Sequence, residues 1–367
     1  MGKMLKIWDQ MNKLYGNNGN AKMGPVEPIT TGCISLDEAV GIWGIPKGRI
    51  VQFAGKESSG KTLMSLIAIR EWQKISPENW AVFIDAEDTF DSLWAETIGI
   101  DLDRLFMIES NDGIEIWTQL CGVPHKELGK PKTTPGILDL EKENPSGLGI
   151  IVLDSIASVT TPIEMTKKVG HTNIAPMGRF MPDALKRLTP LLSQTGVVFI
   201  AINQVRVDVG KMWGDPTTTP GGKAWKHACS VMVHFTMSDS KKTWFIDEIS
   251  GKKVGHVAGA RIDKNKIGFP MCFCNFEILN FGTGTLNKNK EIGELAIKYG
   301  IVGRPNNRTY IFGKDKWTSR DSFFEALESG TIVHDLLEKI KNAKESGIKP
   351  AKKESDEWED VTQTEEE

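Results

Sequence analysis

The segment Gly55-Lys56-Glu57-Ser58-Ser59-Gly60-Lys61-Thr62 has the residue spacing of a phosphate-binding loop. Its glycines allow backbone N–H groups to point inward around phosphate oxygens, and a helix that begins after the loop adds the positive end of its dipole. In such loops the lysine, here Lys61, reaches the β- and γ-phosphates, and the hydroxyl, here Thr62, binds Mg²⁺. The segment therefore predicts a site for ATP and Mg²⁺.

Two carboxylates follow apolar, strand-like segments, as a nucleotide-hydrolysing site requires. Asp154 ends the run Ile150–Leu153, in the position of the acid that steadies the metal, often through water. Glu87 lies just past the run Trp80–Ile84, where a carboxylate can orient and polarise an attacking water. The simpler alternative is that one of the acids in Asp85-Ala86-Glu87-Asp88 merely caps the next helix.

Asp91 and Trp94 could contact the nucleotide base. They are three positions apart, so they share one face if a helix begins at Asp91. Trp94 would then stack on the base while Asp91 accepts a hydrogen bond from its amino group. The alternative is that Trp94 is an ordinary core residue.

Strand and helix patterns alternate around these motifs. Strand-like runs are Ile50–Ala54, Trp80–Ile84, Ile150–Leu153 and Val197–Ile202, and helix-like runs are Thr62–Lys74, Leu93–Ile98 and Ala184–Ser193. This alternation predicts βαβ units and an α/β fold with a parallel sheet. Later runs predict an antiparallel extension of that sheet: Ser230–Met237, Lys242–Asp247 and Phe273–Ile278.

Other regions lie outside this pattern. Residues 3–15 predict a short amphipathic helix, and residues 122–148, rich in Pro, Gly and Lys, predict a surface loop or insertion. Pro182 falls early in a predicted helix, where only the first turn tolerates proline. We expect an N-terminal segment over 1–32, a core over 33–282, a small domain over 283–343 with helices near Glu291–Tyr299 and Ser322–Ala343, and a tail over 344–367.

The composition is that of a soluble globular protein, with 367 residues, 40% of them hydrophobic and 25% charged. No apolar run reaches membrane-spanning length and the N-terminus lacks a signal-peptide pattern, so we expect a cytoplasmic protein without membrane contacts. Five scattered cysteines argue against a disulfide framework, and they are Cys33, Cys121, Cys229, Cys272 and Cys274.

The charge is unevenly distributed. Residues 354–367 contain eight acids and no base, so the other 353 residues carry +5 of a total of −3. Such a polar, acidic tail is expected to be disordered. It is either a solubilising end or an acidic flap that competes with nucleic acid for a basic surface.

Four further segments are motif-like. They are Thr31-Gly32-Cys33-Ile34-Ser35-Leu36-Asp37, Ile202-Asn203-Gln204-Val205-Arg206, Thr218-Thr219-Pro220-Gly221-Gly222-Lys223-Ala224 and Lys264-Asn265-Lys266. Together with the phosphate loop, Asp85-Ala86-Glu87, Asp91 and Trp94, they resemble the bacterial RecA recombinase family from about residue 8 to about residue 343, interrupted over 122–148. Lys56 stands where the family usually has Pro, and Trp94 where it usually has Tyr.

The resemblance implies a RecA-like P-loop NTPase core with a mostly parallel twisted sheet, a short N-terminal polymerisation helix and a small α+β C-terminal domain. It implies an ATP-dependent recombinase that forms a helical filament on single-stranded DNA and exchanges strands with homologous duplex DNA. Single-strand-binding or loader proteins would be further partners.

The resemblance also implies catalytic roles. Glu87 would activate the hydrolytic water, and Gln204 would sense the γ-phosphate and couple it to a DNA loop. Lys264 and Lys266 would reach the ATP of the neighbouring subunit and act as arginine fingers do. From the residues alone, the favoured interpretation of these two lysines is a solvated strand face.

Two loops, over about 164–178 and 205–220, would bind DNA. The resemblance implies that Ile174 and Val209 space base triplets, and that backbone N–H groups at Gly221 and Gly222 hold phosphates. Single-strand binding without sequence preference also needs cations along the backbone. The basic candidates are Arg179, Lys186, Arg206, Lys223 and Lys226, each of which taken singly would be a solvated surface charge.

His227 stands where the family usually has an aromatic residue that relays the ATP signal. With the 122–148 segment and Pro182, it indicates a divergent member, and a phage origin is one explanation that the sequence leaves open. Two alternatives to a recombinase are a RecA-fold motor such as a ring helicase and a DNA-binding protein in which ATP only switches assembly.

Overall fold

The computed structural model describes residues 13, 25–127, 130–161, 164, 176–207, 217–237, 240, 243–279 and 285–346. Most of the predicted helix over 3–15, the candidate DNA contacts Ile174 and Val209, and the acidic tail over 354–367 lie outside the described residues.

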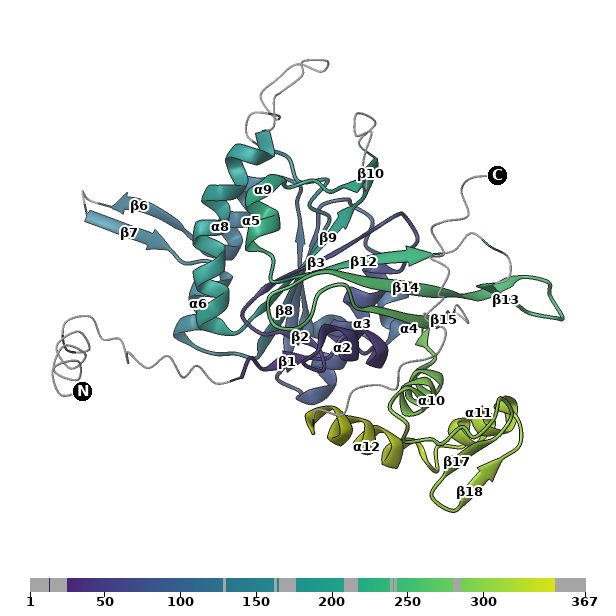
Figure 1. Ribbon diagram of the computed structural model, residues 1–367. Coiled ribbons are helices and arrows are strands. Elements are labelled where there is room, and N and C mark those ends of the chain that lie inside the picture. The colour runs from purple at the N-terminus through teal and green to yellow at the C-terminus, as the bar shows by residue number, and fades with distance from the viewer. Residues whose placement is uncertain are drawn as a thin grey trace.

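Ten strands of the described chain form one sheet, in the order β16-β15-β14-β12-β3-β9-β8-β4-β5 with β13 paired to β14 (Figure 1). The strands from β12 to β5 run parallel, and β13 to β16 form an antiparallel extension. Their bounds are β3 Ile50–Gly55, β4 Trp80–Asp85, β5 Leu105–Glu109, β8 Leu148–Asp154, β9 Val198–Gln204, β12 Val231–Met237, β13 Trp244–Ile246, β14 Lys253–Asn265, β15 Phe273–Leu279 and β16 Thr285–Leu286. The predicted α/β fold with an antiparallel extension is confirmed.

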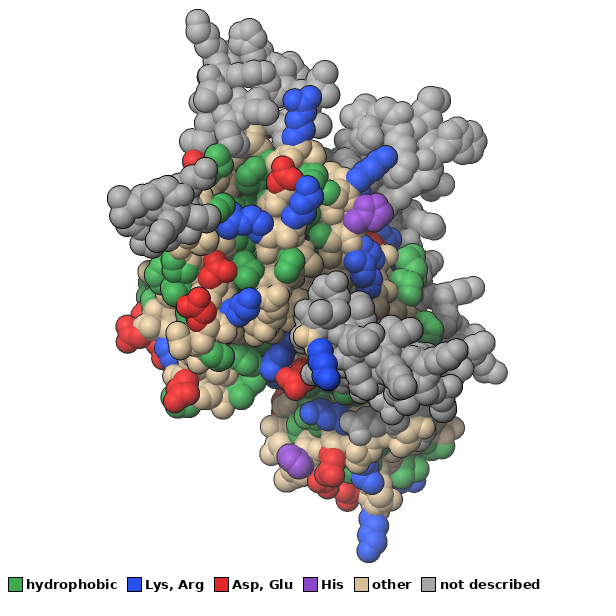
Figure 2. All heavy atoms as spheres, turned by 90° about the vertical axis from the view of Figure 1, so that its left-hand side faces the viewer, with side chains coloured by type: hydrophobic (Ala, Val, Ile, Leu, Met, Phe, Trp, Pro, Cys, Tyr) green, Lys and Arg blue, Asp and Glu red, His purple; other side chains and the backbone are tan. Residues whose placement is uncertain are grey.

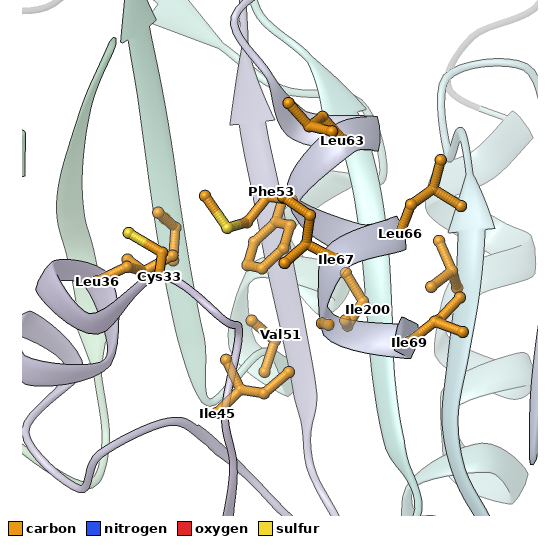
Figure 3. Packing of buried hydrophobic residues seen from close by; sticks show 14 of the residues in the cluster. Cys33, Leu36, Ile45, Val51, Phe53, Leu63, Leu66, Ile67, Ile69 and Ile200 are labelled. Atoms are coloured by element: carbon orange, nitrogen blue, oxygen red, sulfur yellow. The ribbon is translucent and has the colours of Figure 1, made fainter. Parts of the chain in front are cut away.

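Both faces of the parallel part are buried, which explains why its strands read as nearly continuous apolar runs. In β8, Ile150 and Val152 belong to one core, while Ile151 and Leu153 belong to a second core on the opposite face. The first core also contains residues of α3 (Lys61–Ile75) and α2 (Ile34–Val40), and Figure 3 shows Phe53 of β3 packed among them.

Helices cover the two faces. The first core includes residues of α2 Ile34–Val40, α3 Lys61–Ile75 and α4 Ser92–Ile98. The second core includes residues of α5 Gly113–Cys121, α6 Ile137–Glu143, α8 Pro176–Thr195 and α9 Gly222–Ala228. The short strands β1 Pro28–Ile29 and β2 Ile45–Pro46 pair beside the first core, and the turn η1 Leu102–Arg104 precedes β5. The cysteines are free thiols.

Residues 122–148, predicted to be a surface loop or insertion, contain regular secondary structure rather than an irregular loop. β6 (Val123–Glu127) and β7 (Lys130–Thr134) form an antiparallel hairpin that projects from the body (Figure 1), and α6 follows it with Leu138 buried. Two prolines and several lysines disguise the strands in the sequence. A two-stranded hairpin tolerates them because both of its strands are edge strands.

Two other expectations fail. Pro182 and Pro190 lie inside α8 rather than in its first turn. The carbonyls that lose a helical partner are those of Gly178 and Lys186, whose residues are exposed, so water can bind them. The strand β14 was also missed except for its last residues, because its glycines and charged residues weaken the strand pattern.

The C-terminal part has its own core around Tyr310, Phe323 and Leu327. Its elements are α10 Lys288–Lys298, β17 Tyr310–Phe312, β18 Asp315–Trp317, α11 Arg320–Glu328 and α12 Val333–Glu345. This is the small α+β unit implied by the resemblance. Within the described ranges, no helix is both long and apolar enough to cross a lipid bilayer.

Candidate nucleotide site and DNA-binding elements

Parallel strands bring the predicted catalytic residues to one edge of the sheet. Gly55, the first residue of the phosphate loop, pairs with Gln204 at the end of β9, and Asp85 pairs with Asp154 across β4 and β8. Because the carboxyl ends of parallel strands lie at the same edge, the loop and the acids meet there. Glu87 follows β4 at this edge.

The phosphate loop has a backbone that demands glycine at two points. A Cβ atom on Gly55 would lie 2.5 Å from the carbonyl oxygen of Phe235, so the close approach of β12 excludes a side chain. Gly60 has a φ of +90° and is the N-cap of α3. The helix N-terminus therefore faces the loop, as binding of phosphate requires.

The predicted metal ligands are already together. Thr62 Oγ1 donates a hydrogen bond to Asp154 Oδ2 at 2.7 Å, and Lys61 Nζ donates to the carbonyl oxygen of Lys56 at 2.7 Å. A hydroxyl and a carboxylate suit Mg²⁺, which usually takes one or two protein ligands and completes its shell with water and substrate phosphates. The buried Ser59 Oγ has no partner among the described residues, so the loop also keeps a free polar atom.

The electrostatics favour a cation beside Asp154. The pKa of Asp154 is raised to about 6, chiefly by burial and also by the nearby charges of Glu87 and Asp85, against the opposing effects of Thr62 and Lys61. Burial also lowers the pKa of Lys61, although the neighbouring carboxylates counteract this. Negative charge at this edge is thus incompletely balanced, as expected where a divalent ion binds.

Glu87 is the centre of a hydrogen-bond network. Its Oε1 accepts from Ser155 Oγ at 2.5 Å, from Ser158 Oγ at 3.1 Å and from Gln204 Nε2 at 3.2 Å. The alternative that one of the acids in 85–88 caps the next helix is wrong, because Asp91 caps α4. Ser155 and Ser158 were missed in the sequence, although Ser155 directly follows Asp154 across a cis peptide bond.

Asp85 shapes the backbone that carries Glu87. Its carboxylate accepts hydrogen bonds from the backbone N–H groups of Glu87 at 3.2 Å, Thr89 at 2.9 Å and Phe90 at 2.7 Å. The Ala86 N–H also donates to the Asp154 carbonyl oxygen at 2.8 Å. These contacts fix Glu87 relative to the metal-binding edge.

Comparison with known proteins agrees with this geometry. The family described as "RecA N-terminal domain" matches residues 4–122 and 129–286. The chain is 32% identical to Protein RecA of Cytophaga hutchinsonii, over 96% of this chain and 93% of the relative. It is 34% identical to Protein RecA of Staphylococcus carnosus, over 83% and 79%, and 30% identical to that of Ruminococcus albus, over 92% and 78%.

The chain belongs to the RecA family. RecA proteins are DNA-dependent ATPases that act in recombination and repair, so the family confirms the activity predicted from the sequence. The family match is interrupted only over 123–128, which is strand β6 and the residue after it.

The contact of Asp91 and Trp94 with a base stays a prediction for this RecA chain. A helix does begin at this point, since Asp91 Oδ1 accepts from the Trp94 backbone N–H at 2.9 Å. Trp94 is partly buried and packs against the first core. The core alternative therefore has a contact to support it.

Lys264 and Lys266 do not lie on a plain solvated strand face. Lys266 Nζ donates to the His227 carbonyl oxygen at 2.7 Å, and Lys264 Nζ donates to those of Lys226 and His227. Both ammonium groups therefore lie at the C-terminus of α9, where the helix dipole favours cations. Their reach to a neighbouring subunit stays a prediction.

The described ends of the two predicted DNA loops lie together. β10 (Arg206–Val207) pairs with β11 (Thr217–Thr218), which closes the second loop at its base. A Cβ atom on Gly222 would lie 3.8 Å from Gly178 Cα, so the start of α9 adjoins the start of α8. Gly221 and Gly222 have φ values of +104° and +73°.

The basic candidates that the structure describes are on the surface. Arg179, Lys186, Lys223 and Lys226 are exposed on α8 and α9. Lys186 pairs with Asp183 at 2.8 Å, which offsets its charge. Figure 2 views the molecule from the side that carries α6 and α8, and Lys and Arg side chains are prominent in its upper part.

Proposed function

We propose that this RecA chain polymerises on single-stranded DNA and uses ATP to drive pairing and strand exchange with a homologous duplex. The observation that carries the proposal is the hydrogen bond from Gln204 to Glu87. Glu87 stands at the nucleotide edge, and Gln204 ends the strand that leads into the second DNA loop.

At the nucleotide site, residues 55–62 would surround the phosphates. Lys61 would leave the carbonyl oxygen of Lys56 and pair with the β- and γ-phosphates, and Thr62 and Asp154 would hold Mg²⁺. The bound ion supplies positive charge to the phosphate oxygens. Glu87, held by two serine hydroxyls, would orient the attacking water and accept its proton.

Gln204 would couple this site to DNA. Its amide donates to Glu87 in the described state, and a γ-phosphate would offer it a second acceptor. Exchange between the two acceptors would shift the end of β9 and the loop that follows. DNA contacts at Gly221, Gly222, Lys223 and Lys226 would respond, because they lie just beyond that loop.

Self-assembly would complete the site. Lys264 and Lys266 would extend from α9 to the ATP of the next subunit, and the N-terminal segment over 1–32 would pack on a neighbour. Head-to-tail contacts of this kind do not close, so they build helical filaments. Loader proteins or single-strand-binding proteins would act on the same DNA.

The decisive experiment measures ATP hydrolysis with and without single-stranded DNA, together with strand exchange on a homologous duplex. We expect hydrolysis to rise with DNA and joint molecules to form. Stimulated hydrolysis without joint molecules would overturn strand exchange, and unwinding of a tailed duplex would then identify a motor. Absence of DNA stimulation would point to an assembly switch.

A further inference from the structure

Three polar side chains with no assigned role are buried between the phosphate loop and the second DNA loop. Gln52 of β3, Asn203 of β9 and Trp225 of α9 are 1%, 0% and 0% exposed, respectively. Gln52 lies three residues before Gly55, and Asn203 directly precedes Gln204. Each of the three therefore belongs to an element that also carries a nucleotide or DNA contact.

The three side chains share hydrogen bonds. Gln52 Oε1 accepts from Trp225 Nε1 at 2.7 Å and from Asn203 Nδ2 at 3.1 Å. Asn203 Nδ2 also donates to the carbonyl oxygen of Pro220 at 2.9 Å. In a buried environment such bonds are strong, and a partner left unpaired is costly. The arrangement therefore ties three elements to one another.

Trp225 and Asn203 hold the same turn from two sides. Pro220 precedes Gly221, and a Cβ atom on Gly221 would lie 2.8 Å from Trp225 Cγ. The indole ring thus packs directly against the turn that opens α9, while Asn203 binds the carbonyl just before it. Gln52 fixes both side chains through one oxygen atom.

Neighbouring residues on β9 point to opposite faces of the sheet. Gln204 is bonded to Glu87, and Asn203, one residue earlier, is bonded to Gln52 and Pro220. A shift of the strand end that moves Gln204 must therefore also move Asn203. Asn203 Oδ1 is buried without a partner in the described part of the chain, so its two Nδ2 bonds alone orient this amide.

We propose that Gln52, Asn203 and Trp225 are positioning residues that transmit the nucleotide state to Pro220–Gly222, the C-terminal end of the second DNA loop. The role rests on the proposed function, since it concerns coupling between ATP and DNA. The network sets how strongly the nucleotide changes DNA affinity, and it does not take part in the chemical step.

The test compares the affinity of the full-length protein for a fluorescent oligo-dT in the presence of ATPγS and of ADP. Gln52→Met keeps the side-chain length but removes the acceptor. We expect the ratio of the two dissociation constants to fall at least about 5-fold, the lower end of typical coupling between sites. Hydrolysis without DNA should stay within about 2-fold of wild type, since Gln52 makes no contact with the groups of the nucleotide site.

Two further variants separate coupling from folding. Gln52→Glu keeps an acceptor oxygen at the same position, so it should retain the wild-type ratio. Trp225→Phe keeps a buried ring but removes the Nε1 donor, so it should lower the ratio less than Gln52→Met does. If Gln52→Met does not fold, Trp225→Phe and Gln52→Glu decide the question.

The outcomes are distinguishable. A wild type with equal affinities in ATPγS and ADP would overturn the proposed function itself. A wild type with unequal affinities, and folded Gln52→Met and Trp225→Phe variants that keep the same ratio, would overturn only the relay. A ratio that falls in Gln52→Met but keeps its wild-type value in Gln52→Glu would establish the relay. A purely structural contribution would change the melting temperature and leave the ratio intact.

Discussion

Two regions of the molecule hold buried or half-buried carboxylates, and these carboxylates are neutralised in different ways. At the nucleotide edge, Asp154 and Glu87 accept hydrogen bonds from uncharged hydroxyl and amide groups. The nearby Lys61 donates its hydrogen bond to a backbone carbonyl oxygen and not to either carboxylate. At the junction between α2 and the C-terminal unit, by contrast, Glu38 contacts cations directly.

The junction is held by hydrogen bonds and ion pairs of two glutamates. Glu38 accepts from Lys298 Nζ at 3.0 Å and from the Tyr299 hydroxyl at 2.7 Å, and Lys344 lies 3.7 Å from it. Glu291 Oε2 accepts from the Ser35 N–H at 2.9 Å and from Cys33 Sγ at 3.4 Å. These groups join α10 and α12 to α2, and they need no ligand to do so.

The difference shows how the same residue types serve function and architecture. A buried charge costs free energy unless it is paired. At the junction, Glu38 meets this requirement within the chain, whereas the nucleotide edge leaves a lysine and a carboxylate ready to pair with phosphate and metal. Substitutions should therefore affect activity at one region and stability at the other.

The largest expected effect is at Lys61. Lys61→Ala removes the cation for the β- and γ-phosphates, and ATP hydrolysis with single-stranded DNA should fall by about 10³-fold, as for loss of a transition-state donor. The matched control is Lys298→Ala at the junction, which should hydrolyse ATP normally but unfold at lower urea. Normal ATP hydrolysis by Lys61→Ala would contradict the assignment of residues 55–62 as the phosphate site.

Glu87→Gln should separate binding from chemistry. The amide keeps the size of the side chain and an acceptor for Ser155, but it cannot take a proton from water. We expect hydrolysis to fall by about 10²-fold while ATP binding is retained, measured by steady-state hydrolysis and by binding of a fluorescent ATP analogue. Equal losses in binding and turnover would instead make Glu87 a structural residue.

The sequence predicts the residues of the nucleotide site better than it predicts the residues that hold them in place. The phosphate loop, Asp154 and Glu87 follow from local spacing and from the rule that parallel strands end at one edge. Ser158, Gln52 and Trp225 reach their partners only through the folded sheet, so no local pattern marks them. The strands β6, β7 and β14 were missed because prolines, glycines and charges outweigh their weak alternation.

Asp154 should make nucleotide binding depend on pH. Its pKa is raised to about 6, and Mg²⁺ binds only the ionised carboxylate. The affinity for Mg²⁺–ATP should therefore fall as pH drops below about 6, by up to about 10-fold per pH unit. Titration of a fluorescent ATP analogue between pH 5 and 8 checks this. Asp154→Asn should bind weakly with little dependence on pH, and a steep pH dependence in that variant would assign the effect to another group.

The smallest effects concern stability at the junction, where two glutamates should respond to pH in opposite directions. Burial alone would raise the pKa of Glu38, but Lys298, Tyr299 and Lys344 together lower it. Glu38 therefore contributes stability above its unfolded pKa, and this contribution is lost as pH falls through the folded value. Burial raises the pKa of Glu291 to about 7, so its contribution is largest at low pH and falls as pH rises from about 4.5 to 7.

Urea unfolding at pH 5 and pH 8 tests this opposition. Glu38→Gln should lower the free energy of unfolding at pH 8 by about 1 kcal/mol, because it removes the ionic partner of Lys298 and Lys344. The free energy of unfolding of Glu291→Gln, relative to that of wild type, should be higher at pH 8 than at pH 5 by on the order of 1–3 kcal/mol. The reason is that the amide never has to bury a charge. If the free energies of unfolding of the two variants changed with pH in the same direction, Glu38 and Glu291 would share one environment. The contrast between a compensated and an uncompensated carboxylate would then not hold within the junction.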